Sequence, residues 1–315
     1  MPKAPLLSVC IPAYNRPAWL RRGLESIAVG DGTDIEVIIT DDSDTDQGQA
    51  IAADVLENWS GVWRYEHHQQ PLGMAQNWNR AIQWATGQYV MVLHDDDFFL
   101  PQGLGRLVNK LQGLGNQYPV LLFGVWVVDA QERVMKRQKF RQDEFLPPHN
   151  ALIRLFSNSS LVRFPAVVIR RDLFVEVGYF NPDWREPCDL EMWMRLFANY
   201  GVYCCREATV AYRVHAQALT MASFHEKTVE ILLRLFEELA KFNLLSGSEL
   251  EQCKQLFFHQ YILAGAWRQL RRGQWDTFKA VMGLWQLPEL GGMLWTPKWC
   301  FFRSLFTALA RLPYP

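Results

Sequence analysis

Three adjacent carboxylates, Asp95, Asp96 and Asp97, follow an apolar segment and come directly after His94. Adjacent carboxylates repel one another and are costly to bury without a counter-charge. A divalent cation such as Mg²⁺ or Mn²⁺ removes that cost, because hard cations prefer oxygen ligands and can join a carboxylate to a diphosphate. The alternative is an acidic turn that caps a helix after Pro101. The apolar segment in front of the run favours a metal site.

A second acidic pair, Asp41 and Asp42, closes the β-branched segment at residues 35–40. A carboxylate at such a position can accept hydrogen bonds from a nucleobase imide or a ribose hydroxyl. The competing interpretation is a simple turn, because Asp and Ser favour bends of this kind. A third polar loop, around Tyr14 and Asn15, follows the first apolar segment, so three polar loops stand where apolar segments end.

The segments that must position these loops alternate between two patterns. Short apolar runs, typical of buried strands, lie at residues 6–12, 35–40, 63–67 and 89–93. Helical periodicity lies between them, at residues 18–28, 47–59 and 73–85. This alternation predicts a doubly wound α/β sheet flanked by helices, in which ligands bind beyond the carboxyl ends of the strands. The three polar loops are therefore expected to meet at one edge of the sheet.

The second part of the chain continues this organisation and then changes character. Strands are predicted at residues 120–128, 133–139, 165–169, 201–205 and 210–214, and helices at 101–118, 150–156, 171–177 and 189–198. From about residue 225 onward, helical periodicity continues with few strand signals. We therefore predict a catalytic domain over residues 1–222 and a helical C-terminal region over residues 223–315.

Composition excludes several functional classes. The net charge of −1 at pH 7 provides no basic field for nucleic-acid binding. The six cysteines form no CxxC pair and no zinc-type spacing, which indicates a reducing compartment. No run approaches the roughly 20 apolar residues of a membrane-spanning helix, and the N-terminus lacks the pattern of a signal peptide. We expect a cytoplasmic protein, or one that is peripheral on the inner face of a membrane.

The C-terminal segment at residues 295–311 combines many aromatic residues with three cations. Such a segment could lie in a membrane interface and present an active site to a lipid-linked acceptor. It could equally pack against the catalytic domain or mediate dimerisation with a second subunit. The segment is apolar on more than one face, so both interpretations stay open.

Four segments along the chain resemble, in the same order, the motifs of family 2 inverting glycosyltransferases. Ser8–Arg16 is similar to their first strand and loop, and Glu36–Asp44 to their second strand with its nucleotide-binding aspartates. Gly87–Asp97 resembles the strand that leads into their DxD motif. Val177–Arg195 resembles their Gly-x-Phe and Glu-Asp-x-x-Leu-Trp-x-Arg segment. The resemblance covers roughly residues 6–215 and leaves out the final hundred.

This resemblance implies a GT-A fold with a Rossmann-like, mostly parallel sheet, to which the helical C-terminal region is an extension. It also implies a nucleotide-diphosphate sugar donor, a divalent cation (Mn²⁺ or Mg²⁺) and inversion at the anomeric carbon. The implied nucleotide-binding residues are Pro12, Ala13, Tyr14, Asn15, Asp41 and Asp95. The implied metal ligands are Asp96 and His215, and the implied catalytic base is Asp189.

The chain departs from the family pattern at two positions. His94 stands where many relatives carry Asp, and its role is open between a site residue and a polar residue at a strand end. Cys188 stands where the family usually has Glu. Glu186 or Glu191 could replace that lost acid, or either could serve as the base in place of Asp189.

Other residues are expected to support the site. Trp193 and Arg195 lie on the predicted helix that begins at Asp189, and Asp97 adds an acid to the run at the strand end. Arg213 could contact the phosphates of a donor. The basic run at residues 136–139 is expected to be a solvated hairpin.

The function expected from these residues is transfer of a sugar from a nucleotide-diphosphate donor to an acceptor hydroxyl, in surface polysaccharide or glycan assembly. The acceptor would be a glycan or a lipid-linked sugar. A nucleotidyltransferase is disfavoured, because the loop from Pro12 to Pro17 lacks the glycines that cradle a triphosphate. A degenerate, non-catalytic nucleotide-sugar-binding protein would explain His94 and Cys188, but retention of Asp96 and Asp189 argues against it.

Overall fold

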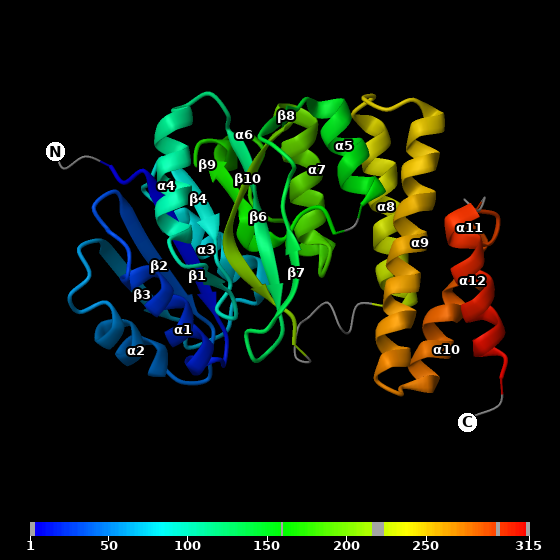
Figure 1. The fold of residues 1–315 in the computed structure, drawn as a ribbon, viewed down its shortest axis with the longest axis horizontal. Helices are drawn as coiled ribbons and strands as arrows, with labels where there is room; N and C mark the ends of the chain where they lie inside the picture. The colour runs from blue at the N-terminus through cyan, green and yellow to red at the C-terminus, as the bar shows by residue number, and fades with distance from the viewer. Residues whose placement is uncertain (1–3, 159, 216–223, 294–296, 313–315) are drawn as a thin grey trace. The chain divides into compact units, whose positions relative to one another are not determined.

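A computed structural model describes residues 4–158, 160–215, 224–293 and 297–312. Its centre is a 10-stranded sheet with the strand order β3-β2-β1-β4-β9-β6-β10-β5, to which β7 adds beside β6 and β8 beside β10 (Figure 1). The chain divides into two compact units. One comprises residues 1–148 and 162–215, and the other comprises residues 149–161 and 216–315. The predicted domain boundary at residue 222 lies outside the described residues.

The first half of the sheet is parallel, as predicted. Its strands are β1 (Leu7–Ala13), β2 (Ile35–Asp41), β3 (Val62–His67) and β4 (Tyr89–Val92), and the helices between them are α1 (Pro17–Ala28), α2 (Gln47–Val55) and α3 (Met74–Trp84). Strands β1, β2 and β4 are buried along their whole length, which explains why their sequences are apolar without alternation. Helix α2 ends four residues before the predicted Trp59, whose indole N–H donates instead to the carbonyl of Gly30.

The second half of the sheet is mixed. Its strands are β5 (Phe98–Phe99), β6 (Val120–Val128), β7 (Val134–Gln138), β8 (Glu144–Leu146), β9 (Val167–Arg170) and β10 (Val202–Arg213). Strand β9 lies antiparallel between β4 and β6, and β10 runs parallel to β6. The prediction of separate strands at 201–205 and 210–214 was wrong, because β10 crosses the polar interruption with register shifts near Ala208. Such bulges let a strand continue through residues that do not alternate.

Helices complete both units. The sheet unit contains α4 (Gly103–Leu114), α6 (Leu173–Glu176) and α7 (Cys188–Tyr200). Helix α5 (Pro148–Ser157) belongs almost entirely to the other unit, with α8 (Glu226–Lys241), α9 (Gly247–Arg271), α10 (Trp275–Gly283), α11 (Pro288–Gly291) and α12 (Pro297–Ala310). Among the described residues, no helix is both long enough and apolar enough to cross a membrane.

Buried Glu36 fixes the end of the sheet where β4 begins. It is 2% exposed, and its Oε1 accepts hydrogen bonds from the Ser8 hydroxyl at 2.6 Å and from the backbone N–H groups of Thr86 and Gly87 at 2.6 and 2.9 Å. The carboxylate thereby joins β1 and β2 to the turn before β4. A side chain at position 87 would lie 2.6 Å from the Ser8 oxygen, so the turn requires glycine there. The strand that carries the acidic run therefore starts from a fixed point.

We predict that Glu36→Ala lowers the free energy of unfolding by about 3 kcal/mol, because it leaves the backbone N–H of Thr86 and the buried Ser8 hydroxyl without their acceptor. Glu36→Gln keeps one acceptor oxygen and is expected to cost less. Urea unfolding followed by circular dichroism measures both changes. The exposed Glu57→Ala serves as the control, with an expected change within about 0.5 kcal/mol. Equal stability of Glu36→Ala and the control would contradict this role.

Candidate active site

The three polar loops meet at the carboxyl edge of the parallel strands, as predicted. Ala13 at the end of β1 pairs in register with Asp41 at the end of β2. On the other side of β1, the backbone N–H of Leu93 donates to the carbonyl of Cys10, which brings the run after β4 to the same edge. Parallel strands end together, so residues far apart in sequence share one site.

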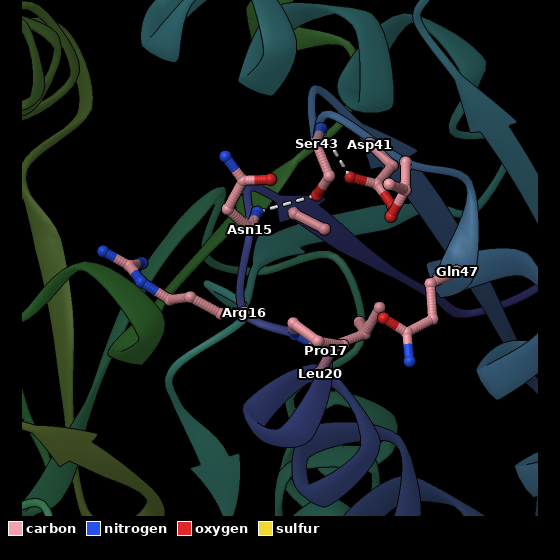
Figure 2. Close-up of a pocket in the computed structure, with 10 residues that line it drawn as sticks. Asn15, Arg16, Pro17, Leu20, Asp41, Ser43 and Gln47 are labelled. Atoms are coloured by element: carbon pink, nitrogen blue, oxygen red, sulfur yellow. Dashed lines mark hydrogen bonds between the residues drawn. The ribbon is translucent and has the colours of Figure 1, made fainter.

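A cavity of about 170 Å³ opens between the loop after β1 and the start of α2. Figure 2 shows Asp41, Ser43 and Gln47 around this cavity. Asp41 is held in place by the Tyr65 hydroxyl, which donates to its Oδ2 at 2.8 Å, and by the backbone N–H of Ser43, which donates to Oδ1 at 2.9 Å. The backbone N–H of Asn15 donates to the Ser43 hydroxyl at 2.7 Å, so the two loops form one wall.

The predicted nucleotide-binding residues take different positions around this cavity. Ala13, Asn15 and Asp41 line it. Pro12 is buried in β1, and the Tyr14 side chain is 54% exposed. Seven further residues line the cavity although no sequence pattern selected them: Arg16, Pro17, Leu20, Ser43, Thr45, Gln47 and Gly48. The polar ones follow strand ends, which is the one signal that could have identified them.

Each acid of the run after β4 has a different partner. Asp95 accepts from the backbone N–H of Tyr14 at 2.9 Å, and Asp97 from the backbone N–H of Arg213 at 2.8 Å. Burial, reinforced by the neighbouring Asp96, raises the pKa of both carboxyl groups. The pKa of Asp96 shifts in the opposite direction. Burial alone would raise it, but the hydrogen bond with His215 at 2.8 Å outweighs burial and lowers the pKa of this carboxyl group. Asp96 is therefore the acid of the run that stays most readily ionised.

Arg16 is a site residue that the sequence did not single out. Its Nη1 lies 3.0 Å from Asp95 Oδ1 and 3.2 Å from Asp96 Oδ2, so one guanidinium bridges two of the three acids. Figure 2 shows its side chain extending away from Asp41 and Gln47. Arg16 follows directly after the Tyr14–Asn15 loop, and only the folded chain brings it to the run after β4.

Two buried atoms beside Asp96 have no hydrogen-bond partner among the described residues: His94 Nε2 and Asp97 Oδ2. Ligand atoms of His94, Asp96 and Asp97 lie within 4.8 Å of one another. Burial lowers the pKa of His94, whose ring packs against Trp78 and Phe164, so the imidazole is neutral and its nitrogen can accept a cation. The donor set, one imidazole with two carboxylates, fits a divalent cation.

His215 and Arg213 brace this cluster from the end of β10. His215 is bonded to Asp96, and its ring lies 4.5 Å from that of Trp19. The Arg213 side chain is buried; its Nε donates to the Asp96 carbonyl at 2.8 Å and its Nη2 to Glu132 at 3.0 Å. These bonds fix the backbone of the acidic run, so Arg213 has a supporting position. A role of His215 as a metal ligand stays a prediction.

Asp189 lies in the first turn of α7, as predicted, and accepts from the backbone N–H of Leu190 at 2.6 Å. Burial raises the pKa of its carboxyl group to about 6. Its neighbour Cys188 is fully buried, and burial raises the pKa of that thiol as well. A neutral thiol therefore stands at the position where the resemblance implies Glu, next to Asp189 in the first turn of α7.

The remaining residues of this segment have structural partners. Glu191 is buried and forms a two-point ion pair with Arg195, with N–O distances of 2.6 and 2.9 Å. Arg195 also donates to the carbonyls of Gly178 and Tyr179, which fixes the turn before α7. Trp193 is buried against the rings of Phe164 and Phe180. Glu186 is exposed in the loop before α7.

The sequence pattern of the family described as glycosyl transferase family 2 matches residues 8–178, which carry the cavity and the acidic run. The chain belongs to this family. It is similar to a GalNAc(5)-diNAcBac-PP-undecaprenol beta-1,3-glucosyltransferase of Campylobacter jejuni, with 23% identity over 282 residues that cover 88% of this chain and 87% of the relative.

Two solved structures show that this family 2 glycosyltransferase has the GT-A fold. S. aureus TarS 1-349 in complex with UDP-GlcNAc superposes with a TM-score of 0.65 at 17% identity, over 97% of this chain and 89% of that one. Mannosyltransferase PcManGT from Pyrobaculum calidifontis, in complex with GDP-Man and Mn2+, gives a TM-score of 0.55 at 15% identity, over 98% and 81%. The expected fold class is thereby confirmed.

We predict that Asp189→Asn stabilises this glycosyltransferase at pH 8 by up to about 3 kcal/mol. The folded pKa of about 6 lies above the unfolded value, so the stability contributed by the protonated form is lost as pH rises through about 6. Asparagine carries no buried charge and avoids this loss. Urea unfolding at pH 8 and pH 5 measures the effect, and the gain should shrink at pH 5.

The exposed Asp183→Asn, on the short turn η2 (Pro182–Trp184) before α7, is the matched control and should change stability at neither pH. An Asp189→Asn variant that is no more stable than wild type at pH 8 would show that the pKa of Asp189 is not raised in the folded protein.

Proposed function

We propose that this chain is an inverting, divalent-cation-dependent glycosyltransferase that moves a sugar from a nucleotide-diphosphate donor to a hydroxyl of a lipid-linked glycan. The observation that carries the proposal is the juxtaposition, at one sheet edge, of the Asp41 cavity and the His94, Asp96 and Asp97 cluster. A nucleoside and a metal-bound diphosphate need two such sites side by side.

The donor nucleotide is proposed to bind with its base in the cavity. Asp41 is fixed by Tyr65 and Ser43, so its carboxylate is held ready to accept a hydrogen bond from a base or ribose. The Ser43 and Asn15 loops are bonded to each other, which reduces the ordering cost of binding. Pro12, Tyr14 and Asp95 are proposed to support the loop after β1, since the backbone N–H of Tyr14 donates to Asp95.

His94, Asp96 and Asp97 would hold the cation, with His215 bonded to Asp96 on its outer side. A bound Mn²⁺ or Mg²⁺ supplies positive charge that stabilises a leaving diphosphate. Arg16 adds a second positive group at the same place, because its guanidinium already bridges Asp95 and Asp96. Charge that develops on the leaving group would therefore meet preorganised cations.

Asp189 is proposed to act as the general base. It would take the proton from the acceptor hydroxyl as that oxygen attacks the anomeric carbon, on the face opposite the departing diphosphate. A carboxyl pKa of about 6 leaves Asp189 ionised at neutral pH yet more basic than an ordinary aspartate. Both carboxylate oxygens of Glu191 are bonded to Arg195, which favours Asp189 over Glu191 as the base.

The acceptor class is inferred from the relative in Campylobacter jejuni, which by its name acts on an undecaprenol-linked glycan and spans most of this chain. A lipid-linked acceptor is consistent with a role in surface polysaccharide or glycan assembly. It also suggests a role in acceptor binding for residues 216–315 of the helical unit, which lie outside the family match at residues 8–178.

A transfer assay tests the proposal. The enzyme is mixed with Mn²⁺, a panel of UDP-, GDP- and dTDP-sugars, and a short-chain polyprenyl-diphosphate glycan, and the product linkage is read by NMR. We expect a product whose anomeric configuration is opposite to that of the donor. Asp189→Asn should keep donor binding, measured by thermal shift, and lose at least about 100-fold in kcat/KM.

The exposed Asp183→Asn is the matched control and should transfer sugar at the wild-type rate. Full activity in Asp189→Asn would move the base elsewhere. A product with the donor's anomeric configuration would exclude inversion, and failure of every nucleotide sugar to stabilise the protein would contradict the donor site.

A further inference from the structure

Helix α12 (Pro297–Ala310) buries one side and exposes apolar side chains on the other. On its inner face, Arg303 and Phe306 are buried, and the Phe306 ring lies 6.0 Å from that of Phe278 in α10. Phe301 and Leu305 are 66% and 42% exposed on the opposite side. In an α-helix, positions 301 and 305 lie on the line opposite the stripe formed by 303 and 306. A helix on a soluble domain normally carries polar residues there.

The exposed apolar surface extends beyond one line of the helix. Leu312, 53% exposed, follows two residues after the end of α12. Phe302 is 43% exposed on the flank of the helix between its two sides. Trp267 of α9 is 50% exposed but stacks on Phe306 of the inner face. We call Phe301, Phe302, Leu305 and Leu312 the outer apolar face.

Positive charge accompanies this face. Residues 260–315 contain seven Lys and Arg but only Asp276 and Glu289 as acids, although the whole chain has a net charge of −1. Arg271, Arg272 and Arg311 are exposed. The Lys279 ammonium group donates to the carbonyl of Leu312 at 3.1 Å, so the end of α12 lies beside α10, the helix that begins just after Arg271 and Arg272 (Figure 1).

We propose that the outer apolar face docks in the interface of an anionic lipid bilayer, with α12 lying in the plane of the membrane. Exposed Phe and Leu side chains enter the boundary of the acyl chains, and flanking cations pair with anionic headgroups. A second copy of this chain is a poorer partner, because two faces with the same positive charge repel. The proposal extends the proposed function, since a lipid-linked acceptor is anchored in such a surface.

Vesicle co-sedimentation of the full chain tests this docking. We expect binding to vesicles of equal parts phosphatidylglycerol and phosphatidylcholine, and little binding to phosphatidylcholine alone. Added salt should weaken the binding, because screening acts on the headgroup contacts. The double variant Phe301→Ser, Leu305→Ser and the triple variant Arg271→Gln, Arg272→Gln, Arg311→Gln should each bind at least about tenfold more weakly.

The control replaces two apolar residues of the sheet unit that are even more exposed than Phe301 and Leu305: Val29→Ser and Val175→Ser, at positions 86% and 81% exposed. This control should bind like wild type, and circular dichroism checks that every variant folds. Equal vesicle binding by all variants, or none by wild type, would overturn the proposal. So would a solution dimer, seen by light scattering, that Phe301→Ser dissociates while vesicles are not bound.

Donor binding is measured in the same preparations without vesicles. Loss of vesicle binding with intact nucleotide-sugar binding would refute only the docking surface. Vesicle binding by a chain that binds no nucleotide sugar would refute only the proposed function.

Discussion

The mutual repulsion of Asp95, Asp96 and Asp97 at the end of β4 is the constraint around which this site is built. The carboxylates are bound by residues from distant parts of the chain: Arg16 after β1 bridges Asp95 and Asp96, His215 beyond β10 bonds Asp96, and the backbone N–H of Arg213 donates to Asp97. The parallel strands must therefore end at one edge before the run can be buried. Even then, Asp97 Oδ2 and His94 Nε2 have no hydrogen-bond partner among the described residues, so both atoms can still bind a cation.

The two departures from the family pattern have physical consequences that differ. At position 94, an imidazole stands in place of a carboxylate, so the cluster carries one negative charge fewer. Burial lowers the pKa of this imidazole and keeps it neutral, so its nitrogen can bind a cation. At position 188, a buried thiol removes a charge next to Asp189. Asp189 thereby titrates without a neighbouring acid at that position, and its raised pKa comes from burial alone.

Much of the sheet edge could be predicted from the sequence, because apolar runs that end in polar residues locate strand ends. Asp41 and Asp96 were found in this way and lie at or just after strand ends, whereas Asp189, in the first turn of α7, was selected through the resemblance to the family. Arg16 was missed because its partners are about eighty residues away in the chain, and no local pattern records such a pair. The continuity of β10 was missed for a related reason: its bulges depend on pairing with β6. The exposed side of α12 could likewise be identified only from the structure, which shows that Arg303 and Phe306 are buried.

Titration of the protein with Mn²⁺, followed by electron paramagnetic resonance, tests whether a cation binds at the acidic run. We expect one bound Mn²⁺ per chain, with binding weakened at least about tenfold in Asp96→Asn. Asp54→Asn, at an exposed carboxylate on α2, should bind Mn²⁺ as wild type does. Absence of Mn²⁺ binding both with and without a nucleoside diphosphate, or unchanged binding in Asp96→Asn, would contradict a cation as the counter-charge of the acidic run.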